Sequence, residues 1–354
     1  MQNGSEIRTY WRLLAGLLST VILFAGGAIS TAYAAEKAAP AATDAFQQNR
    51  LLGRGVNVIG YDPLWRDREK GRFQDKHFRL IREAGFQHVR INLHPFRDAK
   101  LGKDHPLSAA YLATLDWAID QALANRLSVV VDFHEFQAMG EDPEGNRPRM
   151  LNFWRQVAER YKDRPAEVVF EILNEPNKKL TPELWNEVLT ETLTLIRQSN
   201  PTRTVVVGPA SWNNINSLDK LKLPEDDRHL IVTVHYYSPF DFTHQGAPWA
   251  GKKDKLGVPW NGDAKDREAI ERDFGKAQAW AQEHRRPLYL GEFGVYDKAE
   301  MAARVRWTSF VTRQAEKLGW SWAYWQFDGD FIVYDMKTQT WVEPIRDALV
   351  PPAK

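Results

Sequence analysis

Short apolar runs recur along the chain and alternate with longer stretches whose apolar residues are spaced for helices. Eight runs are rich in Val, Ile, Leu, Tyr and Trp: Gly55–Ile59, Phe86–Leu93, Leu127–Phe133, Val168–Leu173, Thr204–Val207, Leu230–Tyr236, Pro287–Leu290 and Ser321–Phe327. Most of them lack strict alternation of polar and apolar residues, which is typical of strands buried on both faces of a parallel sheet. The runs therefore predict eight buried strands.

The stretches between the runs have the periodicity of amphipathic helices. They are Lys76–Ala84, Leu112–Asn125, Pro148–Tyr161, Pro182–Gln198, the less regular Trp212–Asp227, Asp266–Glu283, Ala299–Leu318 and a short final helix over Ile345–Leu349. This α/β alternation predicts a (β/α)8 TIM barrel. An open doubly wound sheet shares the pattern, but neither G-x-G-x-x-G nor G-x-x-x-x-G-K-[ST] follows the first run, which disfavours its nucleotide-binding versions.

The N-terminal 34 residues have the features of a signal peptide. Arg8 and Arg12 form a positive region, Leu13–Ala28 is almost entirely apolar, and residues 32–34 read A-Y-A, a typical cleavage site. We expect cleavage after Ala34 and a secreted or periplasmic protein without stable membrane contact. An uncleaved anchor is the alternative, because an apolar run of about 20 residues can span a bilayer.

The rest of the chain is expected to form one domain. Residues 35–48 are Ala-rich and lack periodicity, so they predict a short, unstructured tether. No low-complexity linker interrupts residues 49–354, which we expect to form the single barrel domain, a monomer.

Charge and cysteine content narrow the class of protein. The chain has 47 Lys and Arg against 46 Asp and Glu, and loss of residues 1–34 removes two basic residues and one acidic residue. The resulting balance argues against a nucleic-acid-binding protein, which usually has a basic excess. The absence of Cys excludes disulfides, thiolate-bound zinc and a thiol nucleophile.

Polar and aromatic residues gather where the apolar runs end. They are Arg90 in the second run, Asp132, His134 and Glu135 at the third, Asn174 and Glu175 after the fourth, His235 and Tyr237 at the sixth, Glu292 after the seventh and Trp325 in the eighth. In a TIM barrel the carboxyl ends of all strands surround one active-site mouth. We therefore expect these side chains to converge there.

Glu175 and Glu292 are the residues on which the chemistry would depend. Strands four and seven lie across an eight-stranded ring from each other, so the two carboxyl groups can face one another. Glycoside hydrolysis needs such a pair, with one protonated carboxyl group as the acid and one ionised carboxylate. Mutual repulsion is expected to raise one pKa, and Arg90 to lower the other. A structural ion-pair network is the alternative.

These residues carry a resemblance to glycoside hydrolase family 5, the cellulase family. The stretch Val168–Asn177, which reads VVFEILNEPN, is similar to the family signature, and the similarity extends over about residues 50–335. Arg90, His134, Asn174, Glu175, His235, Tyr237, Glu292 and Trp325 follow the family's order. The resemblance implies a (β/α)8 barrel that hydrolyses glycosidic bonds by a retaining double displacement. It also implies carboxyl groups about 5–5.5 Å apart.

The resemblance also assigns roles to the matching residues. It implies that Glu175 is the acid/base, Glu292 the nucleophile, Asn174 the residue that binds the sugar 2-hydroxyl, and His235 the partner of the acid/base. Arg90 and Tyr237 would hold the nucleophile, His134 would line the site, and Trp325 would be a sugar platform. Two departures leave the substrate subtype open: Tyr61 follows Gly60 where many cellulases have Asn, and Asn92 stands where many have Pro.

Aromatic residues in the predicted loops are candidates for further sugar platforms, since flat rings suit the apolar faces of sugars. The candidates are Trp65, Trp212, Trp249 and Trp260. The long loop Ser238–Lys265 is expected to form one wall of a groove, because long loops are often functional. Trp117, Trp154, Trp185, Trp280 and Trp307 lie in helical stretches and are predicted to pack in the core.

No metal or cofactor is expected. Asp132, His134 and Glu135 could suggest a metal site, but the ligand set is incomplete, and hydrogen bonding within the site is the favoured interpretation. The two-carboxylate mechanism requires no cofactor.

The expected function is that of a secreted endo-β-1,4-glucanase with a β-glucan polysaccharide or oligosaccharide as its substrate. A β-mannanase, a xyloglucanase, a β-1,3-glucanase and a transglycosylase would use the same site. A non-catalytic carbohydrate-binding protein on the same fold is a further alternative.

Overall fold

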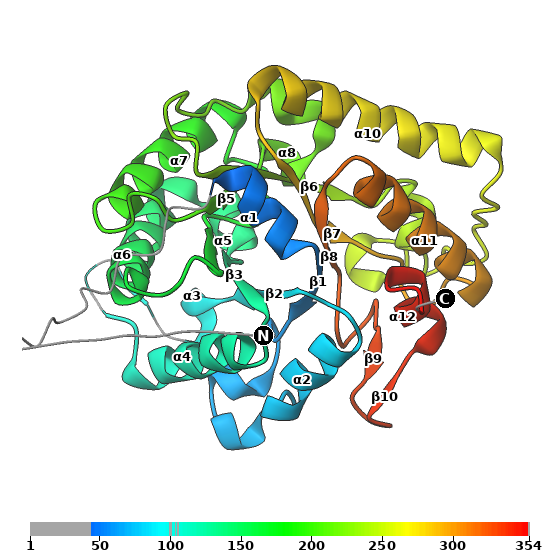
Figure 1. Ribbon diagram of the computed structural model, residues 1–354, viewed down its shortest axis with the longest axis horizontal. Coiled ribbons are helices and arrows are strands. Elements are labelled where there is room, and N and C mark those ends of the chain that lie inside the picture. The colour runs from blue at the N-terminus through cyan, green and yellow to red at the C-terminus, as the bar shows by residue number, and fades with distance from the viewer. Residues whose placement is uncertain (1–43, 99–100, 103, 105, 353–354) are drawn as a thin grey trace, which may run out of the picture. The chain divides into compact units, whose positions relative to one another are not determined.

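Eight parallel strands close into a barrel in the computed structural model, and each pairs with its neighbours in chain order (Figure 1). They are β1 (Arg54–Val58), β2 (His88–Leu93), β3 (Ser128–Phe133), β4 (Val168–Glu171), β5 (Val205–Val207), β6 (Leu230–Tyr236), β7 (Leu288–Phe293) and β8 (Ser321–Tyr324). The structure describes residues 44–98, 101–102, 104 and 106–352. The predicted (β/α)8 barrel is confirmed.

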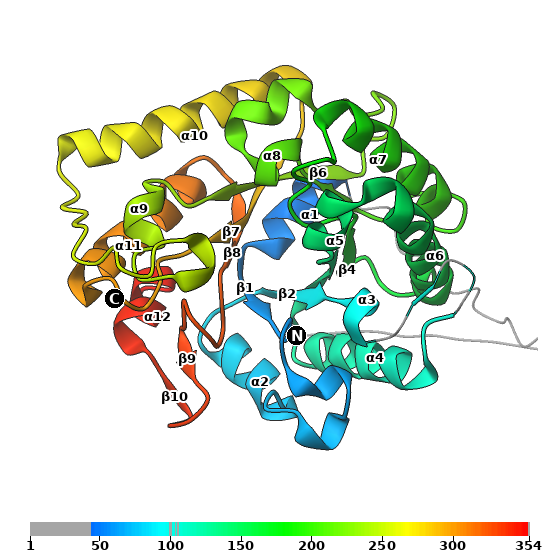
Figure 2. The ribbon, with the colours of Figure 1, turned by 180° about the vertical axis from the view of Figure 1, so that it is seen from behind.

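Helices surround the strands, as Figure 2 shows from behind. They are α1 (Ala45–Leu52), α2 (Asp75–Glu83), α3 (Pro95–Asp98), α4 (Ala109–Ala124), α5 (Phe136–Glu141), α6 (Pro143–Tyr161), α7 (Pro182–Arg197), α8 (Ala210–Asn213), α9 (Phe240–Thr243), α10 (Ala264–His284), α11 (Met301–Lys317) and α12 (Glu343–Leu349). Ser108, Thr181 and Asp263 begin α4, α7 and α10 by accepting hydrogen bonds from backbone N–H groups of the first turn.

Two predicted features differ from the structure. The helix expected over Trp212–Asp227 is reduced to α8 and a 3-10 helix over Ile215–Lys220, because left-handed backbone at Ser211 and Trp212 interrupts it. A small antiparallel hairpin of β9 (Tyr334–Asp335) and β10 (Thr340–Trp341) follows the barrel and was not predicted. Strands of two residues are too short to give a periodic signal.

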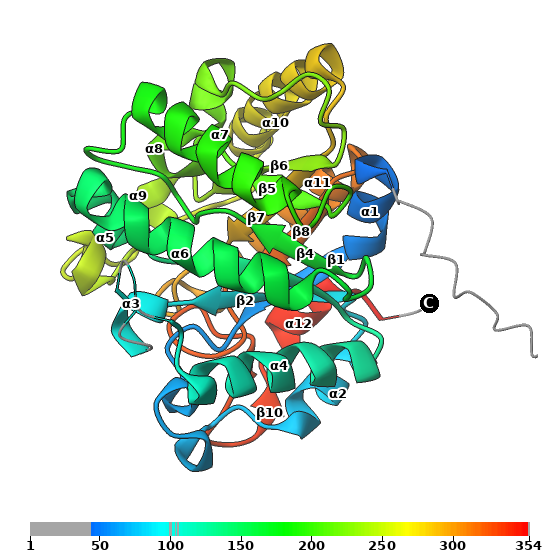
Figure 3. The same cartoon turned by 90° about the vertical axis from the view of Figure 1, so that its left-hand side faces the viewer.

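Helix α1 lies at the amino-terminal end of the barrel, opposite the short helices α3, α5, α8 and α9 (Figure 3). Buried Asn49 donates a hydrogen bond from Nδ2 to the Leu288 carbonyl oxygen of β7 at 2.9 Å. It also accepts one from Ser321 Oγ of β8 at 2.6 Å. The helix is therefore bonded to the last two strands of the barrel.

The unstructured tether predicted over residues 35–48 is therefore wrong from residue 45 onward. Asp44 caps α1 by accepting a hydrogen bond from the Gln47 backbone N–H at 2.8 Å. A helix of two turns shows little periodicity, and this one is held by tertiary contacts. Residues 1–43, with the predicted leader, lie outside the described part of the chain.

The barrel interior changes in character along its axis. Next to α1 it is apolar, with a layer formed by Ala45, Leu52, Val130, Val169, Val206, Ile231, Tyr289 and Ala323. Toward the carboxyl ends of the strands it is charged: Arg90, Asp132 and Glu171 are fully buried there. The apolar layer thus closes one end and the charged layer lies beneath the other.

We expect that Leu52→Ala lowers the free energy of unfolding by about 2–5 kcal/mol, because it removes a fully buried side chain from the apolar layer. Leu51→Ala is the matched control on the same helix. Leu51 is 49% exposed, and its loss should change stability by no more than about 0.5 kcal/mol. Urea denaturation measures both. Equal effects would mean that α1 does not close the barrel.

Candidate active site

A cleft of about 1030 Å³ lies at the carboxyl ends of the strands. Of the eight residues that follow the order of the cellulase signature, seven line it: His134, Asn174, Glu175, His235, Tyr237, Glu292 and Trp325. The eighth, Arg90, is fully buried and bonds directly to Glu292. The predicted convergence holds for these eight side chains, whereas Asp132 and Glu135, which were predicted with them, do not line the cleft.

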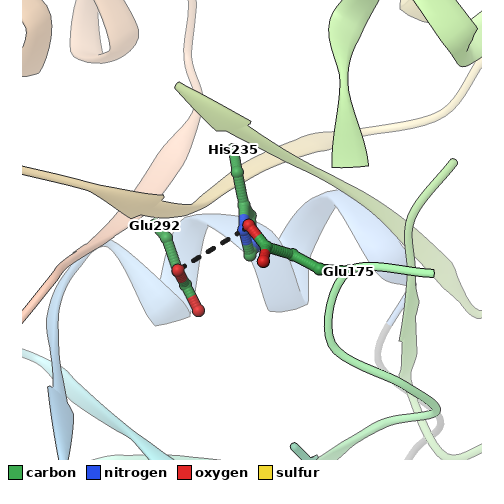
Figure 4. A group of neighbouring side chains, drawn as sticks. All are labelled: Glu175, His235 and Glu292. Carbon is green, nitrogen blue, oxygen red and sulfur yellow. Dashed lines mark hydrogen bonds and ion pairs between the residues drawn. The ribbon is translucent and has the colours of Figure 1, made fainter. Parts of the chain in front are cut away.

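Glu175 and Glu292 face each other across His235 (Figure 4). Glu175 lies on the loop after β4 in a left-handed conformation, with φ of 44°, and Glu292 lies within β7. His235 Nδ1 is 2.8 Å from Glu175 Oε1 and 3.5 Å from Glu292 Oε2. The ligand atoms of the three residues lie within 4.8 Å of one another. The two carboxyl groups are therefore close enough to act on one bound group.

The Arg90 guanidinium is bonded on every side. It donates two hydrogen bonds to Glu171, at 2.6 and 2.9 Å. It donates one each to Asn57 at 2.7 Å, Asn174 at 2.7 Å and Glu292 at 2.9 Å. All five N–H donors of the side chain are thus used, and the orientation of Glu292 is fixed from below.

A second set of hydrogen bonds holds His134 at the wall of the cleft. His134 Nδ1 lies 2.6 Å from Asp132 Oδ2, which is also 3.0 Å from Asn92 Nδ2 and 3.2 Å from Arg90. The His134 ring stacks on Trp325 with centroids 5.4 Å apart and an interplanar angle of 10°. Asn92, one of the two departures from the family pattern, thus joins the polar network beneath the cleft.

Burial raises the pKa of both facing carboxyl groups. The pKa of Glu175 is raised to about 8, although Arg90 lowers it in part. The pKa of Glu292 is raised to about 7 by burial, against the lowering effect of His235 and Arg90. Arg90 lowers the pKa of Glu292 and repulsion from Glu175 raises it, as expected, but desolvation is the largest effect and the net shift is upward. Both groups therefore keep their protons to a higher pH than an exposed glutamate does.

Tyr237 and Asn174 complete the site. Tyr237 OH donates a hydrogen bond to Glu292 Oε2 at 3.1 Å, on the carboxylate oxygen that Arg90 does not contact. Asn174 is 1% exposed, and its Nδ2 has no hydrogen-bond partner among the described residues. A buried, unpaired donor beside the two carboxyl groups can bind an acceptor on a ligand.

The predicted aromatic platforms divide into two pairs. Trp212 and Trp249 line the cleft and are 49% and 61% exposed. Trp65 and Trp260 do not line it, and the prediction for them is wrong. Trp65 is 5% exposed and donates from Nε1 to the Ile59 carbonyl oxygen, and Trp260 is 2% exposed in the core. Both follow strands in the sequence, but their loops turn inward.

The remaining aromatic predictions are confirmed. Ser238, Phe240, His244, Trp249 and Ala250 line the cleft, so the Ser238–Lys265 segment forms part of its wall. Trp117, Trp154, Trp185, Trp280 and Trp307 pack in or against the hydrophobic core.

Two residues of the site lay outside the sequence prediction. Glu171 holds Arg90 from the interior, and Asn213 places its Nδ2 3.2 Å from His235 Nε2. Glu171 lies in an apolar run, and a charged residue in such a run was the signal of a polar barrel interior. Asn213 follows β5 in an irregular segment and gave no periodic signal.

Metal-binding capacity coincides with the carboxyl pair. Among the described residues, one group of three could hold an ion: Glu175, His235 and Glu292. Asp132 and His134 instead bond to each other, and Glu135 accepts a hydrogen bond from the Phe96 backbone N–H at 2.6 Å. The two-carboxylate chemistry requires no metal, and the expected absence of a cofactor stays a prediction.

Two carboxyl groups that face each other at the mouth of such a barrel are the arrangement used by barrel glycosidases. The chain matches the family described as Cellulase (glycosyl hydrolase family 5) over residues 51–330. It is 30% identical over 324 residues to Endoglucanase H of Acetivibrio thermocellus, which corresponds to 88% of this chain and 34% of that protein. The chain therefore spans about a third of that relative.

Solved structures of similar proteins support the same family. Thermotoga maritima Cel5A in complex with cellobiose is 40% identical, with a TM-score of 0.82 and coverage of 87% of this chain and 100% of that one. Its complex with mannotriose has the same identity and coverage and a TM-score of 0.81. The chain belongs to glycosyl hydrolase family 5, the cellulase family.

Proposed function

We propose that this protein is a retaining endo-β-1,4-glucanase. The observation that carries the proposal is the closeness of Glu175 and Glu292, since one carboxyl oxygen of each lies within 4.8 Å of the other. Inverting glycosidases separate these groups by about 6.5–9.5 Å to leave room for a water molecule, whereas retaining enzymes hold them about 5–5.5 Å apart. The short separation supports the double displacement.

In the first step, Glu292 attacks the anomeric carbon while Glu175 gives its proton to the glycosidic oxygen, so that a covalent glycosyl-enzyme forms and the leaving sugar departs as an alcohol. In the second step, Glu175 takes a proton from water, which attacks the anomeric carbon and releases Glu292. The raised pKa of Glu175 supports its role as the acid, and the two donors on Glu292, Arg90 and Tyr237, support an ionised nucleophile.

Three further residues support the reaction by donating hydrogen bonds. Arg90 and Tyr237 each donate to a different oxygen of Glu292 and orient it for attack. Asn174 has a free, buried Nδ2 that can donate to the sugar 2-hydroxyl, a contact that strengthens in the transition state.

The cleft supports a polymeric β-glucan as the substrate. Trp212, Trp249 and Trp325 line it and can stack on sugar rings. β-Mannan is the second candidate, because the Thermotoga maritima relative was crystallised with both cellobiose and mannotriose. The orientation of one hydroxyl group separates these substrates.

We also propose that residues 1–34 are a cleaved signal peptide that directs the enzyme to the periplasm or the medium. The basic start, apolar centre and A-Y-A site support this proposal. Within residues 44–352 as far as they are described, no helix is both long and apolar enough to cross a membrane.

The protein should release a ladder of short oligosaccharides from soluble β-1,4-glucan. Product sizes on β-1,4-glucan, mixed-linkage glucan, xyloglucan, β-1,3-glucan and mannan, resolved by chromatography, measure the preference. Glu292→Gln should lose activity by on the order of 10⁴-fold, since it removes the nucleophile without changing its shape. A folded protein that releases nothing, or that only transfers sugars to sugar acceptors, would contradict the proposal.

Glu175→Ala should lower kcat/KM on cellopentaose by about 10²–10⁴-fold, but far less on 2,4-dinitrophenyl β-cellobioside, whose leaving group needs no proton. For the unchanged enzyme on cellopentaose, kcat/KM should fall above about pH 8, where Glu175 loses its proton. The Glu175→Gln variant on the aryl substrate should lack this alkaline limb. If Glu175 and Glu292 variants respond alike to the aryl substrate, the assigned roles are wrong.

Expression of the full chain in a Gram-negative host should yield a soluble protein whose first residue is Ala35, as read by N-terminal sequencing. The variant Ala34→Asp should remain unprocessed, because the cleavage site needs small residues. A mature protein that begins at Met1 would refute the cleavage.

A further inference from the structure

Asn213 lies directly behind His235, on the side away from the two carboxyl groups. It is fully buried, and its Nδ2 is 3.2 Å from His235 Nε2. The other ring nitrogen, Nδ1, faces Glu175 and Glu292 at 2.8 and 3.5 Å. The imidazole is therefore held between an amide on one side and two carboxyl groups on the other.

The backbone is arranged to place this amide. Ser211, Trp212 and Asn213 adopt left-handed conformations in succession, with φ of 62°, 61° and 54°. Asn tolerates this conformation better than most residues. Across from it, a Cβ on Gly208 would come within 2.1 Å of Asn213 Oδ1, so only Gly leaves room for the side chain. The same turn presents Trp212 to the cleft and Asn213 to His235.

The proton positions on His235 follow from its neighbours. Nδ1 faces carboxylate oxygens from two directions, and such oxygens accept hydrogen bonds, so Nδ1 carries hydrogen. Burial lowers the pKa of His235, although Glu292, Glu171 and Asp132 raise it in part, and Arg90 lowers it further. The ring is neutral for this reason, and its Nε2 has a lone pair that requires a donor. The Asn213 amide is the donor within reach.

We propose that Asn213 is a positioning residue that fixes His235 in the tautomer with hydrogen on Nδ1. This inference rests on the proposed roles of Glu175 and Glu292. With Nδ1–H bonded to Glu175 Oε1, the acidic proton of Glu175 is carried on Oε2, the oxygen available to the glycosidic bond. When Glu175 gives up this proton, the same Nδ1–H stabilises the carboxylate that remains.

Without the amide, the opposite tautomer becomes available. In that tautomer the hydrogen is on Nε2. The lone pair on Nδ1 then accepts a hydrogen bond from Glu175, whose proton is carried on Oε1. The acid is then still protonated, but its proton is bonded to histidine and not to the leaving oxygen. The loss should therefore affect reactions that need protonation of the leaving group and spare those that do not.

The first test compares two substrates in Asn213→Gly, which retains the left-handed backbone and removes the amide. We expect kcat/KM on cellopentaose to fall by on the order of 10-fold to 100-fold, as part of the general-acid contribution is lost. On 2,4-dinitrophenyl β-cellobioside it should change by less than about threefold. Asn200→Gly is the matched control, because Asn200 is also buried and donates to Ala158, a residue of α6, without contact to the cleft.

The second test reads the tautomer directly. The ¹⁵N chemical shifts of the His235 ring, assigned by loss of the signals in His235→Gln, should show a protonated Nδ1 and a bare Nε2 in the unchanged protein. Asn213→Asp should move Nε2 to the protonated form, since a carboxylate accepts a hydrogen bond where the amide donates one. This variant keeps the shape of the side chain and serves if Asn213→Gly does not fold.

Two results would overturn the inference: a hydrogen on Nε2 in the unchanged protein, or an equal loss on both substrates in Asn213→Gly, which would indicate general distortion. Failure of the proposed function is recognised separately. A protein inactive on every glucan, with the Nδ1–H tautomer present and dependent on Asn213, would support the tautomer assignment and refute the glucanase.

Discussion

The site depends on one buried cation. A guanidinium sealed from water is costly unless each of its donors is bonded and its charge is compensated. Arg90 meets both conditions with Glu171, Glu292, Asn57 and Asn174, and Asp132 lies 3.2 Å away. These partners come from four strands and a loop, so the charge can be satisfied only when the barrel is closed. The same contacts orient Glu292, and stability and chemistry therefore share one network.

The network also gives the two facing carboxyl groups, Glu175 and Glu292, different hydrogen-bond partners. Both are buried, and burial alone would favour the neutral form of each. Glu292 has Arg90 and Tyr237 as donors, one on each oxygen, whereas Glu175 has His235 alone among the contacts described here. The two groups are chemically identical, but their hydrogen-bond partners place them in different surroundings.

Much of the fold and of the candidate site could be predicted from the sequence, because the apolar runs and the residues at their ends reflect the barrel repeat. What could not be predicted depends on the direction of a loop or on tertiary contact. Trp65 and Trp260 follow strands as Trp212 does, yet their loops turn into the core. Helix α1 is too short to show a periodic pattern. The pKa of Glu292 depends on how far desolvation exceeds the effect of Arg90, and no pattern in the sequence reports burial at that level.

Helix α1, near the start of the described chain, is bonded to the last two strands of the barrel. Asn49 bonds to Leu288 and Ser321, partners that lie 239 and 272 positions further along the chain. When a ribosome has made the first seven strands, the partner on β8 does not yet exist, and the apolar end of the barrel stays open. Contacts of such long range slow folding. The apolar end of the barrel therefore cannot close until synthesis of the chain is almost complete.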